Sequence, residues 1–233
     1  MRLIIFGASG ATGSRLVEQA LQAGHDVIAV TRRPESIPPR DRLRVVRADV
    51  ADAHAVEAAI VGGDAVLSAL GVSYSRKPIS VYSQGATNIV AAMSQHGVKR
   101  LVVVSSAPLD PAYRASDSFF FTRVLEPVFM RIPGRTLYDD LRRMEAVVRA
   151  SDLDWTIIRS RWLFDAAAVT DYRLAEHSVD GMFTSRADLA ASMLAQLGDD
   201  RYVRRVVGVT TTVGTPSVIR QIWREGVTRP KRS

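Results

Sequence analysis

The 233-residue sequence has no cysteine, only three lysines and four histidines, and no uninterrupted apolar run near the length of a membrane span. The absence of cysteine excludes disulfide bonds, iron–sulfur ligation and thiol catalysis. A spanning helix needs about 20 consecutive apolar residues, so no membrane segment is predicted. The histidines lack metal-ligand spacing, which predicts no metal site. The chain turns glycine-rich at Gly7, too early for a signal-peptide core, and we expect a cytoplasmic protein.

Positive charge is concentrated at one end of the chain. Residues 201–233 hold eight lysines and arginines against a single acid, Glu225, which accounts for the whole net charge of +7. A neutral body with a basic tail gives weak support for nucleic-acid binding, because a patch that follows a phosphate backbone belongs on the folded surface. We interpret the tail as a solvated segment or a subunit contact, in a monomer or homodimer.

Short apolar runs alternate with amphipathic segments along the chain. The runs predict strands and the amphipathic segments predict helices. The expected strands are 2–6, 26–30, 43–46, 64–69, 100–105, 154–159 and 205–209, and the expected helices are about 13–24, 52–60, 79–96, 137–150 and 186–197. This alternation is typical of a doubly wound α/β fold, with a parallel sheet, helices on both faces and ligands at the carboxyl ends of the strands.

The regular alternation weakens after residue 160, where the expected elements become shorter. We interpret residues 1–233 as one domain, in which residues 160–233 contribute a small substrate-side cap and the basic tail. The alternative is that this segment completes the core of the same domain.

A glycine-rich loop lies between the first expected strand and the first expected helix. Its sequence, Gly7-Ala-Ser-Gly10-Ala-Thr-Gly13, has the form G-x-x-G-x-x-G. Glycines there permit a tight turn and close approach of the backbone to a pyrophosphate, and the helix N-terminus offers unpaired N–H groups. The loop therefore predicts a dinucleotide site with the contacts Gly7, Ser9, Gly10, Ala11, Thr12 and Gly13.

Two arginines, Arg32 and Arg33, follow the second expected strand. A site that prefers NAD usually places an acid there for the ribose 2′-OH, and none is present. The planar guanidinium forks suit a 2′-phosphate, so the sequence favours NADP(H) as cofactor. The alternative is that one or both arginines are simply solvated.

Three further strand ends are expected at the same edge of the sheet. Each is ordinary loop sequence by itself, and their shared position makes them candidates for cofactor contact. An acid could bind the adenine amino group, small residues let the dinucleotide pass, and hydroxyls could face the nicotinamide. The candidates are Asp49 and Val50, then Ala69, Leu70 and Gly71, and then Ser105 and Ser106.

Three stretches resemble the atypical short-chain dehydrogenase/reductases, in particular the branch with biliverdin-IX-beta/flavin reductase and the NmrA-like proteins. They are Ile5-Phe-Gly-Ala-Ser-Gly-Ala-Thr-Gly13, Gly85-Ala-Thr-Asn-Ile-Val-Ala-Ala-Met93 and Ser151-Asp-Leu-Asp-Trp-Thr-Ile-Ile-Arg159. The resemblance covers roughly residues 1–165. It implies a Rossmann fold that binds NAD(P) and an NADPH-dependent reductase activity, and it specifies no substrate.

The catalytic residues of that family carry over only in part. Typical members use a Tyr-x-x-x-Lys pair, in which lysine lowers the pKa of the tyrosine. The nearest pattern here, from Tyr138 to Arg142, has arginine instead of lysine, and an alignment on Met144-Glu145 places the inert Leu141 at the basic position. Tyr138 is either a proton donor supported by Arg142 or a bystander near the crevice. Ser106 is the second candidate, as a hydroxyl that polarises the substrate.

Two functional hypotheses follow. The first is an NADPH-dependent oxidoreductase that transfers hydride to a flavin, quinone or similar small planar carbonyl acceptor, because solvent can then supply the proton. The apolar segment 119–130 offers an aromatic pocket for such a molecule, unless it is a core-facing helix. The second is an NmrA-like sensor that binds NADP(H) without turnover and acts through a partner.

Overall fold

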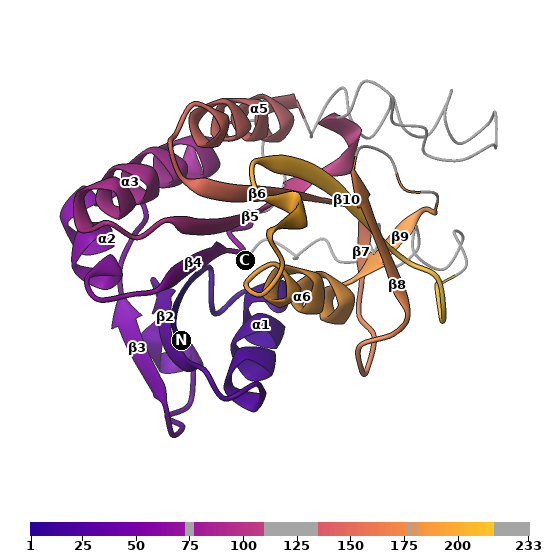
Figure 1. The fold of residues 1–233 in the computed structure, drawn as a ribbon, viewed down its shortest axis with the longest axis horizontal. Coiled ribbons are helices and arrows are strands. Elements are labelled where there is room, and N and C mark those ends of the chain that lie inside the picture. Colours follow the sequence, from indigo (N-terminus) through magenta and orange to yellow (C-terminus); the bar gives the residue numbers. More distant parts are fainter. Residues whose placement is uncertain (73–76, 110–134, 177–178, 180, 217–233) are drawn as a thin grey trace, which may run out of the picture.

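The computed structural model describes residues 1–72, 77–109, 135–176, 179 and 181–216 (Figure 1). Its strands are β1 (Arg2–Phe6), β2 (Asp26–Thr31), β3 (Leu43–Arg47), β4 (Ala65–Ser68), β5 (Arg100–Ser106), β6 (Asp154–Ser160), β7 (Trp162–Phe164), β8 (Tyr172–Glu176), β9 (Phe183–Ser185) and β10 (Arg205–Thr211). Its α-helices are α1 (Ala11–Gln22), α2 (Ala53–Ile60), α3 (Val81–His96), α5 (Arg135–Arg149) and α6 (Arg186–Ala195). None of the helices in these described ranges combines the length and apolarity that crossing a bilayer requires.

Eight strands form one sheet in the order β3-β2-β1-β4-β5-β6-β10-β8. All neighbours pair in parallel except β8, which runs antiparallel to β10 at the edge. The expected strands and helices are confirmed to within a few residues, as is the doubly wound fold. The chain order reverses between β1 and β4, and ligands of open α/β sheets bind at that reversal, beyond the carboxyl ends of the strands.

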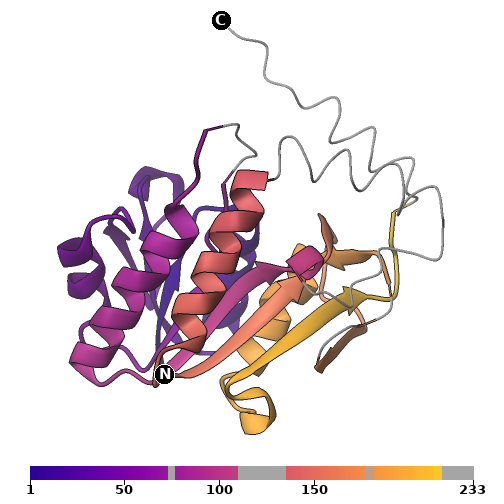
Figure 2. The same cartoon turned by 90° about the horizontal axis from the view of Figure 1, so that it is seen from above.

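The burial of strand β1 shows that the sheet is covered on both faces. All four residues from Leu3 to Phe6 are fully buried, and successive side chains of a strand point to opposite faces. Ile4 and Phe6 join the core beneath α2, α3 and α5, whereas Leu3 and Ile5 join the core beneath α1 and α6. The continuous apolar run therefore specifies a central strand between two helical layers. Figure 2 shows α3 and α5 side by side on one of these faces.

The segment after residue 160 contributes to the sheet, the core and the edge of the crevice. Strand β10 pairs with β6, and α6 packs against α1. Strands β7 and β9 form a separate two-stranded ribbon. The sequence does not predict β7, β8 or β9. Strands β7 and β9 have only three residues each, and β8 lies half exposed at the sheet edge, so it lacks the continuous apolar run that marks the central strands.

Helix α3 is capped by a residue of another helix. Its own N-cap residue, Ser80, makes no side-chain cap hydrogen bond. Instead the fully buried carboxylate of Asp140 in α5 accepts from the Tyr82 N–H at 2.8 Å and from the Ser83 hydroxyl at 2.5 Å. Arg143 donates to the same carboxylate at 3.1 Å and to the Ile79 carbonyl at 3.0 Å. These bonds fix α5 against the start of α3.

Replacing Asp140 with alanine should lower the free energy of unfolding by about 2–3 kcal/mol, because it removes a cap and leaves a buried N–H without its acceptor. Urea unfolding measures this change. The matched control is Asp139→Ala, which removes a partly exposed carboxylate paired with Arg142 and should cost less than about 0.5 kcal/mol. Equal losses in the two variants would contradict the capping role.

Candidate functional site

A cavity of about 700 Å³ runs along the carboxyl edge of the sheet. The loops that follow β1, β2, β3, β4, β5 and β6 all contribute to its wall, together with α3, α5 and the β7–β9 ribbon. The structure brings together every cofactor contact predicted from the sequence except Gly13, which lies beneath the loop. Two of the three predicted catalytic residues, Ser106 and Tyr138, also line the cavity.

The glycine loop is shaped by close contacts that exclude side chains. Gly7 has a φ of +75°, and a Cβ there would lie 2.5 Å from the Ala69 carbonyl oxygen at the end of β4. A Cβ on Gly13 would lie 2.1 Å from the Gly7 carbonyl oxygen. Neither position admits another residue without moving backbone, so these two glycines hold the loop close to β4 and α1 close to the loop.

The third glycine leaves the start of α1 open to the cavity. Gly10 is the N-cap residue of α1 and provides no side-chain cap, and the first turn of the helix carries no acid. The first N–H groups of a helix have no partner within it, and the helix dipole places partial positive charge there. Gly10, Ala11 and Thr12 line the cavity at this end. The arrangement fits a bound pyrophosphate.

Thr31, which no sequence motif marks, joins the glycine loop to the end of β2. Its buried hydroxyl lies 2.7 Å from the Ser9 hydroxyl and accepts from the Arg33 N–H at 3.1 Å. The sequence feature that could have pointed to Thr31 is its hydroxyl-bearing side chain at the end of an apolar strand. These bonds fix the backbone that carries Arg32 and Arg33.

The adenosine end of the cavity, as the fold defines it, has exposed charged groups. Arg32 and Arg33 are both exposed and both line the cavity, and within the described part of the chain neither forms an ion pair. The nearby acid Glu35 instead pairs with Arg47 at 3.5 Å. Asp49, at the end of β3, accepts from the Ala51 N–H at 3.0 Å, so its carboxylate also holds the turn.

The opposite half of the cavity combines apolar walls with hydroxyl groups. Leu137 and Leu141 of α5 and Val81 of α3 provide apolar surface, and Ser106 and Tyr138 provide hydroxyls. The predicted aromatic segment 119–130 and the tail from residue 217 lie outside the described residues. Within the described part of the chain, no three potential metal ligands come together.

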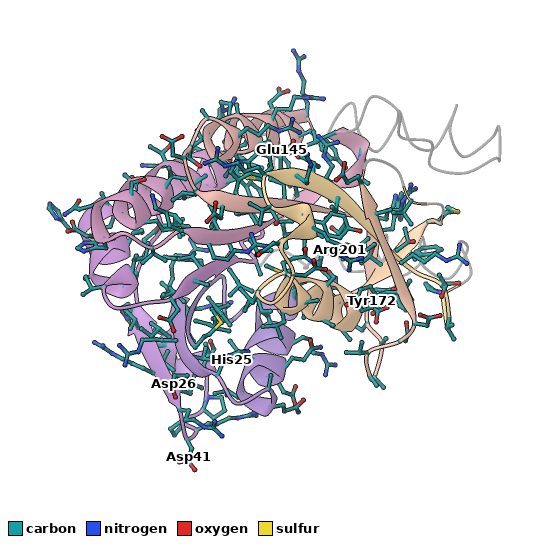
Figure 3. All side chains as sticks on the ribbon, viewed as in Figure 1. His25, Asp26, Asp41, Glu145, Tyr172 and Arg201 are labelled. Atoms are coloured by element: carbon teal, nitrogen blue, oxygen red, sulfur yellow. The ribbon has the colours of Figure 1, made fainter. Side chains whose placement is uncertain are left out.

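Ser105, predicted to lie near the nicotinamide, lines the cavity and also binds a carboxylate that the sequence did not point to. The side chain is buried, and its hydroxyl donates to Glu145 Oε1 of α5 at 2.7 Å. Arg159 of β6 donates to both oxygens of the same carboxylate, at 3.0 and 2.9 Å. Figure 3 shows Glu145 at α5, and its side chain is buried against the sheet. Ser105 thus binds α5 to β5 at the cavity wall, and Ser106 provides a second hydroxyl at the end of the same strand.

The electrostatics of Glu145 depend on this network. Burial by itself raises the pKa of the carboxyl, but hydrogen bonds from Arg159 and Ser105 and the charges of Arg159 and Arg149 outweigh it and hold the pKa below its usual value. The carboxylate is therefore ionised and paired with Arg159 beneath the cavity. The sequence did not predict this role of Glu145, because its contact with Arg159 of β6 joins two residues whose neighbouring sequence gives no sign of the pairing.

Arg142 does not accompany Tyr138, and this corrects the predicted arginine-for-lysine pair. Tyr138 is buried in the cavity wall, whereas Arg142 is exposed and donates to Asp139 at 2.8 Å. Residues four apart share one side of a helix only approximately, and here the side of α5 that holds Tyr138 also holds Leu141 and Glu145. Arg142 therefore lies on the solvent side of α5, away from the cavity.

Fold and site together define a dinucleotide-binding α/β protein. Residues 7–200 match the family model described as NAD(P)H-binding, so the chain belongs to that family. The chain is 28% identical to the UPF0659 protein of Schizosaccharomyces pombe, over 89% of this chain and 88% of that one. The first curated relatives that it matches are uncharacterized mycobacterial proteins, 36% identical, and the match spans 46% of this chain but only 12% of theirs.

Solved structures share the fold over nearly the whole chain. A short-chain dehydrogenase/reductase from Veillonella parvula, crystallised in complex with NADP, has a TM-score of 0.76 at 21% identity, covering 93% of this chain and 98% of that one. ChuY, an anaerobillin reductase from Escherichia coli O157:H7, has a TM-score of 0.68 at 22% identity, covering 93% and 100%. The chain therefore shares its fold with these two proteins.

The Glu145 network predicts a pH dependence of stability. Because its pKa is lower in the folded than in the unfolded state, the carboxylate stabilises the fold above its unfolded pKa, and that contribution is lost as pH falls through the folded value. Glu145→Gln should lower the free energy of unfolding at pH 7 by about 3 kcal/mol, since Arg159 loses its buried partner. The difference from wild type should shrink below about pH 4.

Urea unfolding from pH 7 to pH 3 measures both effects. Glu18→Gln is the control, because Glu18 is exposed and its oxygen lies 4.0 Å from Arg15, a weak surface pair. A Glu145→Gln curve parallel to that of wild type down to pH 3 would contradict the role given to ionised Glu145.

Proposed function

We propose that the protein is an NADPH-dependent oxidoreductase that transfers hydride to a flavin, quinone or similar planar carbonyl acceptor. The observation that carries the proposal is one continuous cavity with two different halves. One half has the glycine loop and the two strand-end arginines, and the other has apolar walls with Ser106 and Tyr138. A dinucleotide in the first half would reach across the chain reversal between β1 and β4 into the second.

The residues present fit NADPH. The cavity beside Gly10 and the N-terminus of α1 would receive the pyrophosphate, and the exposed guanidinium groups of Arg32 and Arg33 would pair with the 2′-phosphate. Asp49 would lie beside the adenine. Bound NADPH supplies the hydride, and the protein supplies binding, orientation and exclusion of water.

A planar acceptor is favoured by what surrounds Tyr138. With Arg142 on the solvent side, that guanidinium cannot act as the cation that lowers the pKa of Tyr138. Reduction of an aliphatic ketone needs a proton donor at the carbonyl oxygen, whereas a flavin or quinone can take its proton from solvent. The apolar walls from α3 and α5 would hold a flat ring, and the Ser106 hydroxyl would polarise its carbonyl oxygen.

The placement of Arg142 also favours a second candidate, a sensor that binds NADP(H) without turnover and acts through a partner. Such a protein needs the cofactor half of the cavity and no proton donor. Steady NADPH oxidation in the presence of an acceptor distinguishes the oxidoreductase from the sensor.

Cofactor preference tests the role of the two arginines. Arg32→Ala or Arg33→Ala should weaken NADPH binding by roughly ten- to a hundredfold, because a charge-assisted bond to a phosphate contributes about 1.5–3 kcal/mol. NADH lacks that phosphate, so its affinity should change little. Titration of both cofactors into wild type and each variant measures this, with Arg44→Ala on β3, exposed and outside the cavity wall, as control. Equal losses for NADH and NADPH would contradict a phosphate contact.

The acceptor is tested by following NADPH oxidation with flavins, quinones and aliphatic ketones. We expect turnover with flavins or quinones. Tyr138→Phe should then change the rate less than about twofold if solvent supplies the proton, whereas loss of a general acid costs about 10²–10⁴-fold. Ser106→Ala should reduce turnover about tenfold or more. If NADPH binds tightly but is not oxidised with any acceptor, the oxidoreductase proposal is contradicted and the sensor is favoured.

A further inference from the structure

The β7–β9 ribbon contributes Trp162 and Leu163 of β7 to the cavity wall, beyond β6 in the strand order and away from β2 and β3. It continues from β6, and Trp162 pairs in register with Phe183 while Phe164 pairs with Ser185. The ribbon is fixed to the main sheet, because the Thr184 hydroxyl donates to the Val209 carbonyl of β10 at 2.7 Å. Residues at its two ends, Arg161 and Arg186, both line the cavity.

Both of these residues are cations held in place by neighbouring structure. Arg161 is only 7% exposed, its N–H donates to Thr184 Oγ1 at 3.0 Å, and its guanidinium donates to the Val179 carbonyl. Arg186 begins α6, and its side chain is 24% exposed. It donates to the Asp165 carboxylate at 3.0 Å. That carboxylate is 59% exposed and does not line the cavity.

The charge of the cavity wall is unbalanced at this end. Asp49 is the only acidic side chain among the described residues of the wall, and it lies at the end of β3, on the far side of the glycine loop. The wall beyond β6 therefore contains the basic residue Arg186 and the largely buried Arg161, and the apolar residues Leu137 and Leu141 of α5 belong to the same cavity wall. Positive charge in a low-dielectric cleft attracts anions and contributes more there than in water.

We infer that the acceptor carries an anionic group, a carboxylate or a phosphate, on its planar apolar body, and that Arg186, in the cavity wall that also contains Arg161, binds this group. The inference rests on the proposed function, since it names the chemical class of the acceptor. A guanidinium presents paired N–H groups that match a carboxylate or phosphate, and the surface ion pair with Asp165 is weak enough for a ligand anion to replace it.

The phosphate groups of the cofactor are the other anions expected in this cavity, and their expected positions lie elsewhere in the fold. The pyrophosphate belongs at the start of α1 and the 2′-phosphate beside Arg32 and Arg33. Arg186 instead follows β9, and the neighbouring Ala187 carbonyl accepts from Gln19 in the third turn of α1, well past the start of that helix. Arg186 is thus left for the acceptor.

Two flavins with the same ring system provide the test, because FMN carries a phosphate and riboflavin does not. Quenching of flavin fluorescence would give both dissociation constants with NADP⁺ at saturation, so that the glycine loop is occupied. Wild type should bind FMN at least tenfold more tightly than riboflavin, and Arg186→Gln should bring this ratio close to one. Asp165→Asn should raise the FMN affinity two- to threefold, because it removes the carboxylate that competes for Arg186.

Arg205→Gln is the matched control. It removes an exposed arginine 3.3 Å from Glu176, outside the cavity wall, and should leave the ratio unchanged. A wild-type ratio near one, or no binding of either flavin, overturns the inference. It is also overturned if Asp165→Asn loses the preference as Arg186→Gln does, which means that the ion pair is structural, or if Arg186→Gln weakens NADP⁺ binding tenfold, which assigns Arg186 to the cofactor.

The same proteins distinguish this inference from the proposed function. If FMN binding is preferred and depends on Arg186 but NADPH is not oxidised, the anion site is supported and the proposed reductase activity is contradicted. If NADPH is oxidised equally well with FMN and with riboflavin, the proposed reductase activity is supported and the anion site is contradicted.

Discussion

The contact between the glycine loop and the end of β4 is the constraint on which the site depends. Gly7 adopts a positive φ directly against the Ala69 carbonyl, and Gly13 packs against the Gly7 carbonyl. These contacts bring β1, β4 and α1 together at the place where the chain order reverses. A Cβ at either glycine would force the backbone of the loop away from β4 or away from α1.

Two buried carboxylates then place α5 over the other half of the cavity. Asp140 caps α3, and Glu145 accepts from Ser105 of β5 and Arg159 of β6. A buried charge is costly unless it is paired and hydrogen-bonded, so each carboxylate holds its partners in one arrangement. Tyr138 and Leu141, on the same side of the helix, reach the cavity because these bonds fix how α5 is turned.

Much of the fold could be predicted because its signals are local. Leu3 to Phe6 are apolar without interruption and form a central strand, and Asp52 at the start of the expected helix 52–60 caps α2, accepting from two backbone N–H groups. The strands β7 to β9 could not be predicted in this way, since β7 and β9 have only three residues each and β8 lies half exposed at the sheet edge. The four-residue spacing along α5 also predicted that Arg142 lies beside Tyr138 in the cavity. The orientation of the helix instead places Arg142 on the solvent side, paired with Asp139.

The sequence by itself determined the alternation of strands and helices, the glycine loop and the two arginines after β2, because backbone conformation and burial of apolar side chains are set by neighbouring residues. The tertiary structure alone decided that Ser105 binds Glu145, that Thr31 joins the glycine loop, and that Arg161 and Arg186 line the same cavity. The last two lie 25 positions apart in the printed sequence. Only the packing of the β7–β9 ribbon beside β6 brings their charges to one wall, because side-chain contacts between distant segments follow from the assembled fold.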